Sequence, residues 1–237
     1  MPIYRLSDEL IFPPPRLAED NGLLAIGGDL SEARLLLAYS MGIFPWYSEG
    51  DPILWWSTDP RLVLFPEDLK VSRSLNQTLR KGVFYITFDE AFEEVIRNCA
   101  SVHSRTNGGT WITEDMLEAY IDLHRAGYAH SVESWSEGRL AGGLYGVSLG
   151  SIFFGESMFT KKSDASKAAF VTLVRQLIKW NFKLIDCQMT TPHLKSFGAS
   201  EIPRSVFMKK LKSALNTPTK RGKWECASPG LNDTPNG

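Results

Sequence analysis

Two segments carry acidic and amide side chains whose spacing could do chemistry. Residues 151–159 (SIFFGESMF) form an apolar run that breaks at Gly155, and a single carboxylate, Glu156, follows the break. Burying such a charge without a partner is costly. Glu156 is therefore a solvent-facing residue at a strand end, a structural carboxylate that holds backbone N–H groups, or part of a site.

The second segment, residues 184–188 (LIDCQ), places Asp186 and Gln188 on one face of a strand by alternation. If this strand lies beside the strand at residues 151–154, Asp186 approaches Glu156 near the strand ends. Two carboxylates beside a glycine and an apolar wall form a candidate catalytic site. Two separate, hydrogen-bonded carboxylates are the alternative.

The composition is that of an ordinary globular protein and argues against several classes of function. The 237 residues are 43% hydrophobic, and they contain no apolar run of the roughly 20 residues that a membrane span needs. The first residues do not resemble a signal peptide, and the three cysteines form no CxxC pair, so we expect a cytoplasmic protein. The four histidines lack zinc-binding spacing, and we expect no metal.

The net charge of −1 conceals an uneven distribution along the chain. Residues 1–159 carry 12 Lys or Arg and 22 Asp or Glu, whereas residues 160–223 carry 14 and 3, a balance of +11. Such a basic segment favours a polyanionic partner such as a nucleic acid. Solvated helix faces are the alternative explanation of the same charges.

The predicted elements indicate two domains and an α+β fold. A helix capped by Ser31 and a tryptophan-rich block belong to a small N-terminal domain, residues 1–61, whose aromatic rings we expect mostly in its core. Residues 62–216 form a larger domain. Residues 217–237 are rich in Pro, Gly and Asn, which predicts a disordered tail.

In the larger domain, apolar periodicity predicts a meander of three strands, then a long helix, a strand and a last basic helix. Helices capped by Ser72, Asp89 and Thr113 precede the meander, and a polar loop follows the second of them at residues 101–109. This order suggests an acyl-CoA N-acetyltransferase-like (GNAT-like) layout by analogy. Residues 161–167 contain no glycine, which argues against a pyrophosphate-binding loop for coenzyme A.

Six motifs, in order along the chain, resemble the leucyl/phenylalanyl-tRNA–protein transferase family. They are residues 22–30 (GLLAIGGDL), 42–46 (GIFPW), 51–57 (DPILWWS), 109–113 (GTWIT), 155–159 (GESMF) and 184–188 (LIDCQ). The resemblance implies a small N-terminal domain, a GNAT-like domain and a cytoplasmic enzyme without metal or cofactor. It also implies transfer of Leu or Phe, and Met less well, from aminoacyl-tRNA to proteins with N-terminal Arg or Lys. Such transfer marks these proteins for N-end rule degradation, and we expect a monomer.

The resemblance further implies roles for individual residues. Glu156, Asp186 and Gln188 would form the catalytic and acceptor-binding group. Trp46 and Trp111 would be the platform for the terminal adenosine of the tRNA. An apolar aminoacyl pocket would be formed by Leu144, Phe153, Gly155, Met158, Phe170, Leu173, Leu177 and Ile185, and a tRNA-binding patch by Arg73, Arg80 and Lys81.

Elementary chemistry agrees with this implied reaction. An aminoacyl ester is already activated, so no protein nucleophile is needed, and an α-amine with a pKa near ~7.7–8.0 needs only modest deprotonation at pH 7. Asp186, directly or through Gln188, would orient the amine and accept its proton. A coenzyme A-dependent N-acetyltransferase and a non-enzymatic RNA-binding module are the alternative functions.

Overall fold

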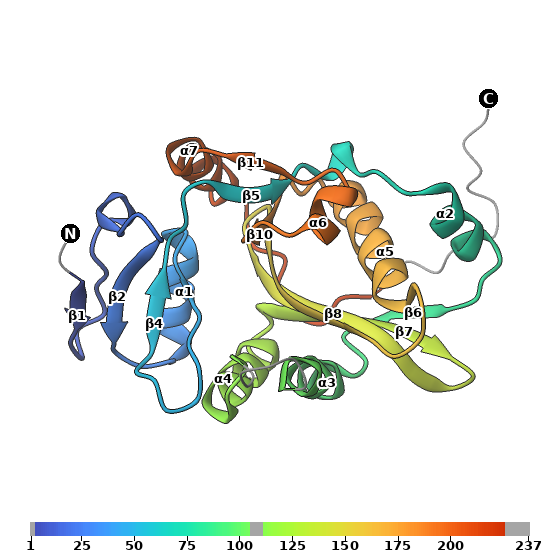
Figure 1. Cartoon of the computed structure of the whole chain (residues 1–237), viewed down its shortest axis with the longest axis horizontal. Helices are drawn as coiled ribbons and strands as arrows, with labels where there is room; N and C mark the ends of the chain where they lie inside the picture. Colours follow the sequence, from blue (N-terminus) through green and yellow to red (C-terminus); the bar gives the residue numbers. More distant parts are fainter. Residues whose placement is uncertain (1–2, 105–110, 226–237) are drawn as a thin grey trace.

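The computed structural model describes residues 3–104 and 111–225, and these residues form two β-sheets (Figure 1). The chain leaves the smaller sheet at residue 56 and enters the larger one at residue 61. Helices pack on both faces of the larger sheet, so the protein mixes α and β structure as expected. No helix in the described ranges is long and apolar enough to span a membrane.

The smaller sheet has four strands: β1 (Tyr4–Leu6), β2 (Leu23–Gly27), β3 (Phe44–Pro45) and β4 (Leu54–Trp56). They lie in the order β1-β2-β4-β3, and α1 (Glu32–Ser40) packs beside them. Ser31 caps α1 as expected, because its hydroxyl accepts a hydrogen bond from the Arg34 backbone N–H at 3.4 Å. The buried Trp55 indole donates to the Gly27 carbonyl at 2.8 Å and thereby ties β4 to β2.

The larger sheet has seven strands: β5 (Arg61–Leu64), β6 (Tyr85–Phe88), β7 (Ala129–Ser136), β8 (Arg139–Leu149), β9 (Ile152–Thr160), β10 (Leu184–Gln188) and β11 (Ser200–Ile202). Their order is β11-β5-β10-β9-β8-β7-β6. The expected meander is confirmed, since β7, β8 and β9 pair antiparallel in succession. β10 then runs parallel to β9, with Asp186 opposite Phe154.

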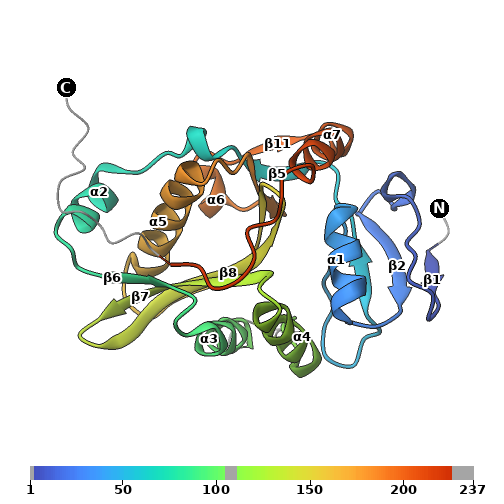
Figure 2. The same cartoon turned by 180° about the vertical axis from the view of Figure 1, so that it is seen from behind.

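Helices cover the two faces of the larger sheet (Figures 1 and 2). α5 (Ala165–Lys179) crosses one face over β7 and β8, and α2 (Arg73–Arg80) packs against it. α3 (Phe92–Ser104) and α4 (Glu114–Arg125) cover the other face. The remaining helices are α6 (Pro192–Ser196), α7 (Arg204–Ala214) and the short 3-10 helices η1 (Pro15–Leu17) and η2 (Pro66–Asp68).

A bulge in β9 shapes the region around Glu156. Gly155 lies opposite Gly146 and Ser157 lies opposite Tyr145, so Glu156 is an extra residue without a partner on β8. Bulges of this kind re-aim a side chain without ending the strand. The expected break at Gly155 is therefore wrong, because β9 continues to its end at residue 160.

A second bulge lies in the neighbouring strand, β10. Asp186 faces Val63 and Gln188 faces Leu62 of β5, which leaves Cys187 as the extra residue. The two bulged strands pair only over residues 152–154 and 184–186 and have no paired residues beyond that point. Their separation opens the larger sheet at the positions of the candidate site.

Two expected local features differ in the structure. Asp89 does not cap α3, because its carboxylate instead accepts hydrogen bonds from the backbone N–H groups of Ser131 at 2.8 Å and Trp224 at 2.7 Å. The polar segment expected as a loop at residues 101–109 is helical up to Ser104, the last residue of α3. The rest of that segment, from residue 105, lies outside the described residues.

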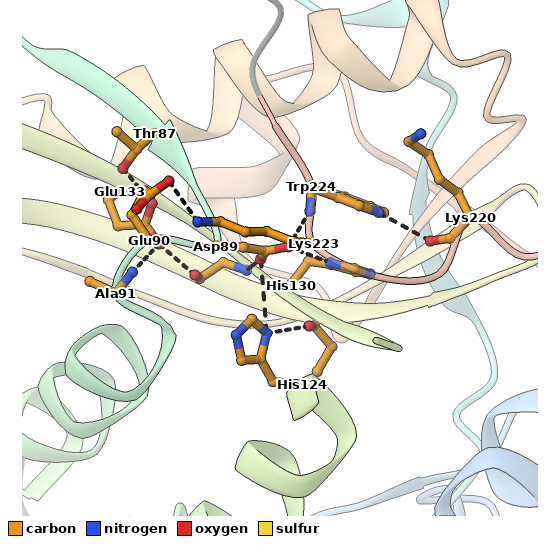
Figure 3. A network of polar contacts seen from close by, with 12 residues as sticks. Thr87, Asp89, Glu90, Ala91, His124, His130, Glu133, Lys220, Lys223 and Trp224 are labelled. Atoms are coloured by element: carbon orange, nitrogen blue, oxygen red, sulfur yellow. Dashed lines mark hydrogen bonds and ion pairs between the residues drawn. The ribbon is translucent and has the colours of Figure 1, made fainter. Parts of the chain in front are cut away.

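The C-terminal segment also differs from the expected disorder. In residues 217–225, Trp224 is buried with 1% of its surface exposed. Its indole stacks on the His130 ring of β7, and both residues are drawn in Figure 3. The large apolar surface of the indole accounts for this, because its burial outweighs the polar character of the neighbouring residues. Residues 226–237 lie outside the described residues.

Candidate functional site

A cavity of about 480 Å³ lies where β9 and β10 separate. Its walls are mostly apolar, and Glu156 and Gln188 are among the polar residues that line it. Most of the residues expected to bind substrate lie on this wall, namely Trp46, Trp111, Leu144, Phe153, Gly155, Met158, Phe170 and Ile185. The structure therefore brings together residues that lie more than 130 positions apart in the sequence.

Leu173 and Leu177 are not on the cavity wall of the described chain, although both were expected there. They lie on α5 and are fully buried in the same hydrophobic cluster as the wall residues Phe170 and Ile185. The family resemblance implied both positions, but a resemblance between sequences cannot tell a wall residue from one in the layer behind it. Their place is therefore behind the wall.

The two tryptophans expected as a platform come from different parts of the chain. Trp46 follows β3 and is 37% exposed, and its ring packs edge-to-face on Trp56 with centroids 5.6 Å apart. Trp111 is half-buried and precedes α4. The hydroxyls of Tyr47 and Thr113 lie 3.2 Å apart, which ties the two tryptophan-bearing segments together. Both rings line the cavity.

Glu156 is held by three neutral donors. Its Oε1 accepts hydrogen bonds from the Tyr39 hydroxyl at 2.9 Å and the Gln188 amide at 3.0 Å, and its Oε2 accepts one from Tyr120 at 3.2 Å. Burial, and to a smaller extent the nearby charge of Asp186, raise the pKa of Glu156 to about 7 against the lowering effect of these donors. This carboxyl group can therefore gain or lose a proton near neutral pH.

Asp186 sits in a different environment from Glu156. It is completely buried, and its two carboxylate oxygens accept hydrogen bonds from Arg61 Nε at 2.8 Å and Arg61 Nη2 at 2.7 Å. The Arg61 guanidinium in turn lies 4.7 Å from the Phe44 ring centroid and 4.8 Å from that of Phe207. Asp186 is not part of the cavity wall in the described chain. Of the two carboxylates expected at the site, only Glu156 therefore lines the cavity, and Asp186 lies in the protein interior.

Asp186 reaches the cavity through Gln188. The Gln188 backbone N–H donates to Asp186 Oδ1 at 2.9 Å, and its backbone carbonyl accepts a hydrogen bond from the Thr58 hydroxyl at 3.1 Å. These contacts hold Gln188 at a φ of +59°, which is unusual for a residue other than glycine. Because the amide nitrogen faces Glu156, the amide oxygen is left to accept a hydrogen bond from a ligand.

Three residues that build this site were not found from the sequence. Arg61, Tyr39 and Tyr120 precede the residues that they contact by 125, 117 and 36 positions. A charged residue at the start of the apolar strand RLVL was the one available signal for Arg61. The two tyrosines fit the apolar periodicity of their helices and carry no separate signal.

The basic residues expected to bind tRNA lie away from the cavity. Arg73 and Arg80 are exposed on α2, and Lys81 is exposed at its C-terminal end. None of the three lines the cavity, whose described wall comes from other elements. Among residues 3–104 and 111–225, no group of three or more His, Cys, Asp and Glu residues could hold a metal ion.

Comparisons with known proteins agree with the family that the sequence motifs resemble. The family model described as "Leucyl/phenylalanyl-tRNA protein transferase" matches residues 63–212, and the model of that family's N-terminal domain matches residues 28–59. Among solved structures, L-PGS from Bacillus licheniformis gives a TM-score of 0.39 at 12% identity, over 85% of this chain and 66% of that one. That score is too low to support a fold assignment.

Curated relatives match over nearly their whole length. Proteins called leucyl/phenylalanyl-tRNA–protein transferase are 60% identical in Syntrophobacter fumaroxidans and 58% identical in Myxococcus xanthus. The matches cover 95% and 94% of this chain, and 96% and 97% of the relatives. Identity of this extent, with both family models matched in order, shows that the chain is an enzyme of the leucyl/phenylalanyl-tRNA–protein transferase family.

Proposed function

We propose that this enzyme transfers Leu or Phe, and Met less well, from aminoacyl-tRNA to the α-amine of proteins that begin with Arg or Lys. The new peptide bond marks these proteins for N-degron (N-end rule) degradation. The observation that carries the proposal is the apolar cavity with Glu156 and Gln188 at its wall, in a chain of this family. The enzyme acts in the cytoplasm as a monomer.

The shape of the cavity suits the donor half of the reaction. Leu144, Phe153, Met158 and Ile185 offer an apolar surface to an unbranched-Cβ side chain such as that of Leu or Phe. One methylene group changes binding by only about 1–3 kcal/mol, so Ile and Val are rejected sterically and incompletely. The terminal adenosine stacks against Trp46 and Trp111, where each stacked base is worth about 1–3 kcal/mol.

The polar part of the cavity wall, formed by Glu156 and Gln188, suits the attack by the acceptor amine. The Gln188 amide oxygen accepts a hydrogen bond from the α-amine and directs its lone pair at the ester carbonyl. The amine nitrogen bonds to that carbon, the ester C–O bond breaks, and the ribose oxygen leaves with a proton. Glu156, which has a pKa near 7 and faces the cavity, takes up the amine proton during attack and returns it to the leaving oxygen.

Asp186 is a positioning residue in this mechanism. Its charge is satisfied by Arg61, and its Oδ1 atom holds the backbone of Gln188. This role replaces the proton-accepting one first expected for Asp186. Glu156, when ionised, also favours an acceptor with a cationic N-terminal side chain, because the donors that hold its carboxylate are neutral.

We infer a GNAT-like arrangement for the larger sheet. Two parallel strands, β9 and β10, separate after Phe154 and Asp186, and the bulge at Glu156 lies at the point of separation. In the proposed complex, the acyl group enters this opening. Arg73, Arg80 and Lys81 bind tRNA phosphates together with the basic segment at residues 160–223, largely without reading the sequence.

One assay tests the function directly. The full-length protein is incubated with tRNA charged with radiolabelled Leu and a peptide that begins with Arg, and the labelled peptide is counted. We expect transfer to this peptide and none to its N-acetylated form, because acetylation removes the nucleophile. Absence of a labelled peptide would refute the proposal, and transfer of acetate from acetyl-CoA to the same peptide would favour an acetyltransferase.

A further inference from the structure

Residues 217–225, here called the strap, lie on the larger sheet far along the chain from the catalytic segments. Thr219 accepts a hydrogen bond from the Gly150 backbone N–H at 2.9 Å, and the Gly222 N–H donates to the Gly127 carbonyl at 3.2 Å. Lys223 forms an ion pair with Glu90 at 2.9 Å (Figure 3). The strap is thus attached at several points to the connections between elements of the larger domain.

The strap ends on a buried indole. The Trp224 backbone N–H donates to Asp89 Oδ2 at 2.7 Å, and the same oxygen is bonded to His130 Nδ1 at 2.8 Å (Figure 3). The indole stacks on the His130 ring with centroids 3.7 Å apart and planes at 8°. Asp89 therefore fixes both the backbone of residue 224 and the ring beneath its side chain.

Trp224 also touches a wall of the cavity from behind. Its ring centroid lies 5.9 Å from that of Phe153, and Phe153 lines the cavity, whereas Trp224 is absent from the described lining. Trp180 and Phe182 also pack edge-to-face against the indole, with ring centroids at 4.9 Å and 5.9 Å, and Trp224 is 1% exposed. The indole thus fills a closed aromatic compartment next to the cavity.

Phe153 has little freedom on its other sides. A Cβ atom at Gly146 would lie 2.5 Å from the Phe153 ring, so the ring rests directly on the glycine backbone of β8. The ring is 1% exposed. With the sheet beneath it and Trp224 beside it, the Phe153 ring can move away from the cavity only if the indole is removed or made smaller.

We propose that Trp224 is a specificity-determining residue, which sets the depth of the cavity by holding Phe153 in place. This inference rests on the proposed transfer reaction and adds a determinant of the donor side chain. A smaller residue at position 224 leaves space behind Phe153, the ring retreats, and the cavity accepts a larger side chain. Full-size Trp224 keeps the cavity short enough for Leu to fill it.

The test compares two donors in one reaction. Trp224→Phe and Trp224→Ala are incubated with equal amounts of Leu-tRNA and Phe-tRNA and an Arg-starting peptide, and the ratio of the two products is measured. Both products come from the same folded molecules, so a loss of stability does not change the ratio. We expect the Phe:Leu ratio to rise about tenfold in Trp224→Ala, and by less in Trp224→Phe.

Glu90→Gln is the matched control, because it loosens the strap at the ion pair with Lys223 but keeps the indole and lies outside the proposed tRNA-binding segment. Its product ratio should equal that of the wild type. An unchanged ratio in both Trp224 variants would overturn the inference and leave Trp224 a purely structural residue. An equal shift in Glu90→Gln would also overturn it, since the position of the strap rather than the indole would then set the ratio.

A binding measurement separates this inference from the transfer reaction. Calorimetry with 3′-deoxy-3′-leucylamino-adenosine and its phenylalanyl counterpart reports the cavity's preference without any acceptor. Failure of the wild type to transfer either amino acid would refute the proposed function alone. The inference about Trp224 would still stand if its variants favoured the phenylalanyl analogue, and it would fall if the two affinities kept the wild-type ratio.

Discussion

Asp186 and Glu156 lie near each other on adjacent strands, yet different kinds of partner hold them. Asp186 is fully buried and forms two charge-assisted hydrogen bonds with Arg61. The donors that reach Glu156 in the described chain are two hydroxyls and an amide, all neutral. An ion pair keeps its charges, whereas a carboxyl group among neutral donors can titrate. Two neighbouring carboxylates can thus take different roles: Asp186 stays charged and stabilises the fold, and Glu156 can carry a proton.

The largest expected effect comes from breaking the ion pair between Asp186 and Arg61. Asp186→Ala leaves the Arg61 charge buried and unpaired, which should lower the free energy of unfolding by about 3–5 kcal/mol. Urea denaturation measures this loss. The double variant Arg61→Met/Asp186→Leu should recover most of it, because no buried charge remains. If Asp186→Ala unfolds at the same urea concentration as the wild type, the ion pair does not stabilise the folded state.

The second prediction concerns stability and pH. The pKa of Glu156 is raised from 4.5 to about 7 by folding, so the folded state binds its proton more tightly than the unfolded state. The resulting stability is fully present below about pH 4.5 and is lost as pH rises through about 7, by at most about 3 kcal/mol. Glu156→Gln should flatten this slope in urea denaturation series. A slope identical to that of the wild type would contradict the raised pKa.

The third prediction concerns Glu156, the carboxyl group proposed to carry the proton. Glu156→Gln should lower kcat/KM for transfer about 100-fold at pH 8, because general acid–base catalysis contributes at least that much. The wild-type rate should rise with pH through about 7, and the variant should keep only the rise due to the acceptor amine. Glu137→Gln, in an exposed position, is the control and should retain wild-type activity. A variant rate within threefold of the wild type would assign the proton to another group.

The smallest expected effect comes from removing one of the neutral donors that distinguish Glu156 from Asp186. Tyr120→Phe removes one donor to Glu156, and since this hydrogen bond lowers the pKa of Glu156, its loss should move the pH midpoint of transfer upward. The cost in stability should be about 1 kcal/mol. Tyr85→Phe, whose ring is 70% exposed, serves as the control. A midpoint shifted to lower pH would show that the donors around Glu156 act in the opposite sense.

Local patterns predicted much of the fold and one part of the site. The proximity of Asp186 to Glu156 follows from the parallel pairing of β9 and β10. Alternation in the segment LIDCQ predicted Asp186 and Gln188 on one face, but the bulge at Cys187 breaks that alternation, and the Gln188 backbone N–H links the two residues instead. The partners Arg61, Tyr39 and Tyr120 could not be predicted in this way. Their contacts join distant elements, and a periodic pattern reports only which face of its own element is apolar.

Two errors share a physical cause. Gly155 looked like the end of a strand, but the residue belongs to a bulge whose geometry is set by β8 rather than by its own neighbours. Trp224 lies among polar residues whose composition indicates disorder, but the acceptor for its backbone N–H, Asp89, lies 135 positions earlier. In both cases, the deciding interaction lies outside any sequence window.

The burial of Trp224 has a consequence for biosynthesis. Chains emerge from the ribosome N-terminus first, and domains generally fold as units. The aromatic compartment beside Phe153 lacks its central ring until residue 224 has emerged, and until then Asp89 and His130 have no cover from the strap. The nascent chain therefore holds an open core through most of its synthesis, and the donor cavity takes its final shape among the last steps of folding.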